Sequence, residues 1–84
     1  MVKRTFGEIR RELIVALSSN SECSINFLSR NCDINWRTVE KHLVYLVGRG
    51  YAEEIFSSEY VRILKATERG QAIAAILEEG DIAI

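Results

Sequence analysis

Apolar residues recur with a helical period over the first part of the chain. Between about Thr5 and Leu17 they return every three or four residues, which places them on one side of a helical wheel. Thr5 and Glu8 have the spacing of a capping box, so we expect a helix to begin here. Val15 lies on the opposite side of this helix, and Ile14 lies on a flank. The side expected to face the core consists of Phe6, Ile9, Leu13, Ala16 and Leu17.

Two further helical patterns follow a polar loop over residues 18–22. Ser24 is a suitable N-cap for a short helix over Ile25–Asn31, because its hydroxyl can accept from a backbone N–H of the first turn. After a turn over residues 32–35, Asn35 can cap a longer helix from Trp36 to about Arg49. Gly50 then takes the position after that helix, where a positive φ costs least. The packed side of the short helix consists of Ile25, Phe27 and Leu28.

The longer helix has one apolar side and one polar side. Its expected core side consists of Val39, Leu43 and Leu46, flanked by Trp36, His42 and Val47. The opposite side carries Arg37, Lys41, Val44 and Gly48, with Thr38, Glu40 and Tyr45 at its edges. Two short helices joined by a four-residue turn form a candidate helix-turn-helix.

After Gly50 the pattern becomes strand-like. Tyr51–Ser57 and Tyr60–Ala66 are rich in β-branched and aromatic residues, and the polar residues between them predict a hairpin. Thr67 can cap a last helix over about Glu68–Glu79, which ends at Gly80. We therefore predict a single domain over residues 1–84, mainly α with a small β-hairpin. It is a winged helix-turn-helix, with the helix-turn-helix over about 24–49, the wing over about 51–66 and a C-terminal helix over about 68–79.

This order of elements resembles that of the winged helix-turn-helix regulators common in archaea, related to the multiple-antibiotic-resistance and arsenic-repressor types. The resemblance rests on Ile34–Leu46, Arg49–Tyr51 and Lys65–Gly70. The last of these stretches is similar to the T-x-x-G that opens the helix after the wing in that group. The resemblance covers roughly residues 8–77. It implies sequence-specific binding to duplex DNA, usually as a homodimer, to regulate transcription.

A geometric argument supports the same function. The major groove is ~12 Å wide and admits one α-helix, whose exposed side chains then reach base edges. Arg37 and Lys41 are four residues apart and so share a face, and Arg37 could contact a guanine through two hydrogen bonds. Two such cations usually belong to a solvated surface, but their place on the second helix of this motif favours DNA. The candidate DNA-contacting residues are Ser24, Asn26, Arg30, Asn35, Trp36, Arg37, Thr38, Lys41, Val44, Tyr45 and Arg62.

The formal net charge of −1 conceals an asymmetry. Residues 1–49 carry eight basic and five acidic side chains, a net charge of +3, whereas residues 50–84 carry three and seven, a net charge of −4. The positive half contains the candidate helix-turn-helix. In the wing, Glu53, Glu54 and Glu59 outnumber Arg62, with Lys65 near the far end of its strand. We therefore expect the wing to contribute little to DNA binding.

The last helix predicts self-association. Ala72–Leu77 is apolar nearly all the way round, and such a helix is normally buried on more than one side. Together with Val15 and the apolar tail Ile82–Ile84, it favours a two-fold symmetric homodimer. The competing interpretation is that the alanine face rests on the first helix. The expected interface residues are Val15, Ile73, Ala74, Ile76 and Leu77.

The sequence does not indicate catalysis, a cofactor or a metal site. His42 is the single histidine and is expected to be a satisfied structural residue, while Cys23 and Cys32 are expected to be small buried residues ~13 Å apart. Trp36 is expected to pack against Phe27 or the preceding helix. No nucleophile–base pair can be assembled, so we predict that the chain is not an enzyme and binds no cofactor or metal.

The N-terminus has no signal-peptide apolar region, and no apolar run approaches the ~20 residues of a membrane span. We therefore expect a cytoplasmic protein that does not contact membranes. The favoured hypothesis is a homodimeric transcriptional regulator that binds duplex DNA sequence-specifically. The acidic wing keeps a second hypothesis open, a winged-helix protein–protein interaction module without DNA binding. A third is a nucleoid protein that binds DNA without sequence preference.

Overall fold

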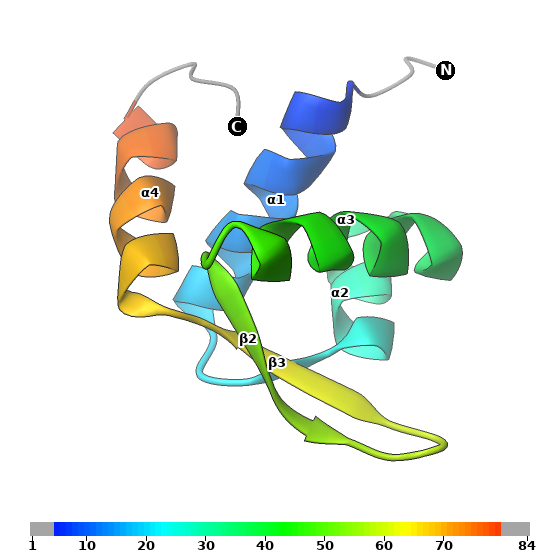
Figure 1. Cartoon of the computed structure of the whole chain (residues 1–84). Helices are drawn as coiled ribbons and strands as arrows, with labels where there is room; N and C mark the ends of the chain where they lie inside the picture. Colours follow the sequence, from blue (N-terminus) through cyan, green and yellow to red (C-terminus); the bar gives the residue numbers. More distant parts are fainter. Residues whose placement is uncertain (1–4, 80–84) are drawn as a thin grey trace.

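The computed structural model describes residues 5–79, which form four helices and a three-stranded antiparallel sheet (Figure 1). Strand β3 lies between β1 and β2, so the sheet order is β1-β3-β2. This mainly helical fold with a β-hairpin wing confirms the predicted fold class. In chain order the elements are α1 (Phe6–Ser19), β1 (Cys23–Ser24), α2 (Ile25–Cys32), α3 (Trp36–Gly48), β2 (Ala52–Ser57), β3 (Arg62–Ala66) and α4 (Glu68–Glu79).

Each of the first three helices begins at the cap predicted from the sequence. Thr5 Oγ1 accepts a hydrogen bond from the backbone N–H of Glu8 at 3.2 Å, which starts α1. Ser24 Oγ accepts from the N–H of Phe27 at 3.0 Å and starts α2. Asn35 Oδ1 accepts from the N–H of Arg37 at 2.9 Å and starts α3. These bonds satisfy N–H groups that have no partner within the helix.

The wing turn contains no glycine. The backbone N–H of Ser58 donates to the carbonyl of Val61 at 2.8 Å, which closes the turn. Ser58 Oγ also accepts from the N–H groups of Tyr60 and Val61 at 3.3 and 3.1 Å. The serine side chain thereby orders a turn that the sequence pattern marked only by its polarity. Strand β3 begins at Arg62, two residues later than predicted.

Strand β1 was missed by the sequence analysis. Cys23 pairs with Leu64 and Ser24 pairs with Ile63, so the residues just before α2 are bonded to the wing. Two residues are too few to produce an alternating pattern of apolar and polar positions. This pairing fixes the start of α2 relative to β3.

The core lies between α1, α2, α3 and α4 and is closed by Leu64 of β3. Ile14 is fully buried rather than on a flank, because α4 packs against this side of α1. The expectation that Phe6 and Phe27 belong to the core was wrong, since both side chains are exposed. Val15 is half-buried rather than outward-facing and packs against the core.

Helix α4 uses part of its apolar surface within the chain. Ala74 and Leu77 are buried against the core, so the expectation that they form an interface between two chains was wrong. The competing interpretation, an alanine face resting on α1, is correct for Ala74. Ile73 is half-buried and Ile76 remains exposed. The tail Ile82–Ile84, also expected at the interface, lies outside the described residues, and residues 1–4 do so too. Over residues 6–79, each helix is too short or too polar to cross a membrane.

Candidate nucleic-acid interface

Helix α3 has its apolar side in the core and its polar side outward. Val39, Leu43 and Leu46 are buried and fix the rotation of the helix about its axis. Arg37 and Lys41 are therefore exposed on the opposite side, together with Val44, whose side chain is 63% exposed. A valine this exposed is available for contact with an apolar group such as a thymine methyl. The structure thus brings these three candidate residues onto one open surface.

The cations of α3 and its C-cap are not neutralised by ion pairs within the described residues. Arg37, Lys41 and Arg49 contact no carboxylate there, and Arg37 and Lys41 lie on the outward face of α3. Their charge is available to an external anion. Glu40 is the acidic residue of this helix, and it lies at the edge nearest the wing.

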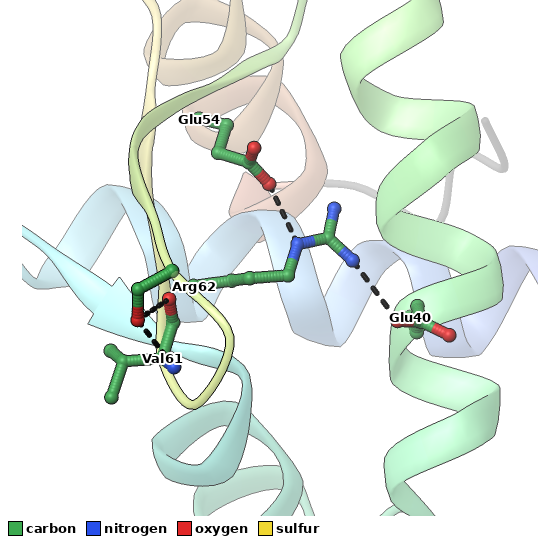
Figure 2. A network of polar contacts seen from close by, with 5 residues as sticks. Glu40, Glu54, Val61 and Arg62 are labelled. Carbon is green, nitrogen blue, oxygen red and sulfur yellow. Dashed lines mark hydrogen bonds and ion pairs between the residues drawn. The ribbon is translucent and has the colours of Figure 1, made fainter.

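The wing holds its own cations in ion pairs. Figure 2 shows the Arg62 guanidinium between two carboxylates: Nε donates to Glu54 at 2.8 Å and Nη1 donates to Glu40 at 3.0 Å. Lys65 Nζ lies 3.2 Å from a carboxylate oxygen of Glu53. Arg62 thus donates to two protein carboxylates, and its contact with DNA stays a prediction. Its bond to Glu40 also weakens the repulsion that this carboxylate would exert on a phosphate.

The other candidate residues differ in how exposed their side chains are. Asn26 and Arg30 of α2 and Trp36 of α3 are exposed. Trp36 is 42% exposed and Phe27 40% exposed, and their rings form no stacked or edge-on pair with each other among the described residues. Thr38, Tyr45 and Ser24 are half-buried, and the oxygens of Ser24 and Asn35 already cap helices. The three candidate residues on the outward side, Arg37, Lys41 and Val44, therefore all belong to α3. The exposed candidates of α2 lie on the helix packed beside it.

A row of alternating cations and aromatic rings runs between α1 and α3, and the sequence analysis missed it. Lys41 Nζ lies 4.6 Å from the centre of the Phe6 ring, and Arg10 Cζ lies 5.6 Å from the same ring. Arg10 Cζ also lies 3.7 Å from the Tyr45 ring, and Arg49 Cζ lies 5.2 Å from it. We call these five residues the cation–aromatic ladder. The spacing of residues 41, 45 and 49 was visible in the sequence, but their packing on α1 was not.

His42 is buried beneath this ladder. Arg10 Nε donates to His42 Nδ1 at 3.3 Å, so the neutral ring carries its proton on Nε2. Nε2 is itself buried with no hydrogen-bond partner among the described residues, so the expectation of a fully satisfied histidine was wrong. Phe6 contacts the ring edge-on, with 5.1 Å between the ring centres. Burial, with the cations of Arg10 and Lys41, lowers the pKa of His42 from its ordinary value of 6.5.

This lowered pKa gives an expected pH dependence of stability. Because the folded chain binds the proton less readily than the unfolded chain, the contribution of His42 is fully present above about pH 6.5. It is lost as the pH falls through the lower pKa of the folded state. His42→Asn retains an acceptor for Arg10 but cannot titrate, so its free energy of unfolding should fall less steeply below pH 6.5. Urea denaturation at several pH values measures this, and identical slopes for both proteins would contradict it.

The structure offers no metal site within the described residues, where no three His, Cys, Asp or Glu side chains converge. Both cysteines are free thiols that hydrogen-bond to α1: Cys23 Sγ to the carbonyl of Ala16 and Cys32 Sγ to that of Glu12. Cys23 is buried as expected, whereas Cys32 is only half-buried. Burial raises the pKa of the Cys23 thiol, and the neighbouring Cys32 adds to this shift. A raised pKa disfavours the reactive thiolate.

Solved structures share this fold. FabT from Streptococcus pneumoniae, solved in complex with DNA, matches with a TM-score of 0.75 and 21% identity over 83% of this chain and 50% of FabT. A MarR family regulator from Neisseria meningitidis matches with a TM-score of 0.74 and 23% identity over 84% of this chain and 51% of its own. A protein from Ralstonia eutropha JMP134, described as a candidate DNA-binding protein, matches with a TM-score of 0.74 and 17% identity over 82% of this chain and 93% of its own.

These likenesses establish a winged-helix fold of the kind found in MarR family regulators. The chain spans about half the length of the first two proteins. All three proteins come from bacteria, so the archaeal type indicated by the sequence resemblance gains no support from them. No family model and no curated protein matches the chain.

Proposed function

We propose that this chain binds duplex DNA sequence-specifically, as a homodimeric transcriptional regulator with α3 in the major groove. The observation that carries this proposal is the outward side of α3, where Arg37 and Lys41 are exposed and make no ion pair within the described residues. The shared fold with FabT, itself solved on DNA, supports it. Such a role needs no catalysis and no cofactor, and it places the protein in the cytoplasm with its DNA.

Each outward residue has a role that its chemistry supports. Arg37 lies on the first turn of α3 and can donate two hydrogen bonds to a guanine. Lys41, one turn later, carries a compact charge suited to a phosphate or a guanine. Val44 supplies an apolar contact to a thymine methyl. From α2, Asn26 and Arg30 are exposed and can donate to phosphates beside the groove.

A homodimer fits the remaining apolar surface. The exposed side of α4 consists of Ala72, Ala75 and Ile76, with half-buried Ile73 beside them. Alanines allow two helices to approach closely, and a two-fold axis would place the same surface on both chains. Two copies of α3 about 34 Å apart could then contact successive major grooves of an inverted repeat. In this proposal Ile73 and Ile76 are the central contacts.

The variant Ile76→Glu tests this interface. Its side chain is 47% exposed, so a glutamate there leaves the core intact but places a charge in the proposed interface. We expect the wild-type protein to sediment as a dimer and this variant as a monomer. Tyr60→Glu is the control, because it places the same group at an 85% exposed position in the wing turn, away from α4. Sedimentation velocity measures both, and an Ile76→Glu protein that stays dimeric would place the interface elsewhere.

A specific observation favours a second candidate function, a protein–protein interaction module. The wing exposes apolar side chains, including Tyr60 at 85% exposure and Phe56, while both cations of β3 are held in ion pairs. A shallow groove of about 190 Å³ lies between α3 and the wing, lined in part by Val44, Val47 and Leu64. Exposed apolar surface of this kind is typical of protein contacts.

A salt titration on duplex DNA distinguishes these functions. The proposed regulator should bind a duplex chosen from a random pool, with an affinity that falls steeply with salt as counterions are released. It should bind random duplex more weakly. Undetectable binding to both duplexes at about 50 mM salt would instead support the interaction module. Equal affinity for both would support a nucleoid protein without sequence preference.

A further inference from the structure

The cation–aromatic ladder is a continuous feature of the surface beside α3. Its contacts run in the order Lys41, Phe6, Arg10, Tyr45 and Arg49, with cation-to-ring distances between 3.7 and 5.6 Å. Three members come from α3 and its C-cap at intervals of four residues, and two come from α1 at the same interval. Positions four apart in a helix lie above one another, so the ladder runs parallel to the axis of α3.

The ladder and the wing border opposite edges of the outward side of α3. Glu40 marks one edge and is bonded to Arg62 of the wing. Tyr45 marks the other edge and is stacked on Arg10 of α1. In Figure 1 the first turn of α1 lies above α3, whereas the hairpin of β2 and β3 extends below it. The outward residues of α3 therefore have a wing with ion-paired cations on one side and the cations of the ladder on the other.

Two of the ladder cations, Lys41 and Arg49, keep donors for an external anion. Arg49 Nε donates to the Tyr45 hydroxyl at 3.1 Å, and its terminal nitrogens have no partner within the described residues. A guanidinium that lies over a ring keeps its N–H groups directed outward in its own plane. Lys41 has no carboxylate partner within residues 5–79. The rings hold these long side chains in place, which lowers the entropy lost when they bind.

We propose that the ladder is a second DNA-contacting surface, which binds the phosphates of one strand along the edge of the major groove. This inference rests on the proposed function. A helix in the major groove lies along it, so a row parallel to that helix follows the neighbouring backbone. Lys41 and Arg49 are eight residues apart, which is ~12 Å along the helix and enough to span more than one phosphate of a strand. The ladder then provides phosphate contacts for which the wing cations, being ion-paired with carboxylates, are not available.

The charge of the ladder distinguishes this partner from a second copy of the chain. Two ladders brought together by a two-fold axis would oppose cations of the same sign, which is unfavourable. A duplex strand instead presents a regular row of negative charges. The contact carries no base preference, because phosphates are the same at every position.

Arg49→Gln tests the proposal, because this residue lies outside the base-contacting positions of α3. We expect its log–log salt slope on random duplex to be smaller by about 0.9 per chain than that of the wild type, as for one lost phosphate contact. Its affinity should fall by the same factor on the selected and the random duplex. Arg49→Lys retains the charge and should retain the slope. Lys65→Gln is the matched control on the wing, where the removed cation is already paired with Glu53, and it should leave the slope unchanged.

The outcomes separate this inference from the proposed function. A wild-type protein that binds with a steep slope, beside an Arg49→Gln protein with the same slope, would overturn the ladder proposal and leave α3 as the binding element. A larger effect of Lys65→Gln than of Arg49→Gln would assign the phosphate contacts to the wing and also overturn it. No duplex binding by the wild type would overturn the proposed function together with this inference. Circular dichroism on each variant confirms that the chain is folded.

Discussion

Replacing Gly70 with alanine is expected to lower the free energy of unfolding by about 3 kcal/mol or more. A Cβ at this position would lie 1.8 Å from the carbonyl oxygen of Tyr51 and 2.8 Å from its carbonyl carbon. These are backbone atoms, which cannot turn aside as a flexible side chain can, so α4 would have to shift away from Tyr51, which lies between α3 and β2. Overpacking a core normally costs ~1–3 kcal/mol, and a clash with backbone lies at or beyond the upper end.

The same contact explains the T-x-x-G pattern at the start of α4. Thr67 Oγ1 accepts from the N–H of Gly70 at 3.0 Å and donates to the carbonyl of Gly50 at 2.6 Å. The N–H of Thr67 donates to the carbonyl of Tyr51 at 3.0 Å. The threonine thus joins α4 to the chain leaving α3, and the glycine allows the close approach that these bonds require.

Gly48→Ala provides the matched control. A Cβ at Gly48 would meet no atom within 4 Å, and its φ is not positive. Alanine is favoured over glycine in a helix by ~0.5–1 kcal/mol, so this variant should be slightly more stable than the wild type. Urea denaturation measures both proteins. A Gly70→Ala protein as stable as Gly48→Ala would show that α4 does not approach Tyr51 this closely.

Replacing Arg37 with alanine is expected to weaken binding to the selected duplex by about 1–3 kcal/mol, roughly 5- to 150-fold. The loss should exceed the loss on random duplex, because two hydrogen bonds to one guanine disappear together with one charge. Discrimination at a single base pair should disappear with them. Fluorescence anisotropy on the selected duplex and on its single-base variants measures both effects.

Arg37→Lys is the matched control for charge. Lysine keeps the cation but not the planar pair of donors, so the salt slope should be retained while base discrimination falls. An Arg37→Ala protein with unchanged affinity and unchanged base preference would contradict the assigned face of α3. The side chain is exposed and makes no ion pair within residues 5–79, so neither change should unfold the protein.

The helix boundaries could be predicted because they depend on local chemistry. Thr5, Ser24 and Asn35 cap their helices through bonds to residues two or three positions later, which the sequence alone displays. Gly50 adopts a φ of +79° just after α3, as its position predicted. The outward side of α3 followed from its helical period in the same way.

The features that were missed depend on contacts between distant segments. Ile14 is core rather than flank because α4 returns to cover it, and Leu77 is buried by the same packing. Strand β1 exists because β3 offers it a partner some forty residues later in the chain. A helical wheel describes one helix at a time, so it cannot show which neighbour covers a given side.

The candidate site shows the same difference between features set by local sequence and features set by contacts between distant segments. Arg37, Lys41 and Val44 could be identified from their spacing on one helix. The pairing of Arg62 with Glu40 joins residues 22 positions apart, and the contact of Arg10 with Tyr45 joins two helices. Sequence therefore identified the outward residues of α3 but not the ion pairs of the wing cations or the ladder that flanks these residues.

The central claim is that the outward side of α3 contacts DNA, and backbone amide chemical shifts of the isotope-labelled chain test it most directly. On titration with the selected duplex, we expect the largest shift changes at the amides of residues 36–48, with smaller changes in α2 and the first turn of α1. The amides of α4 should change little. Shift changes confined to the wing tip or to α4, with α3 unaffected, would contradict the account.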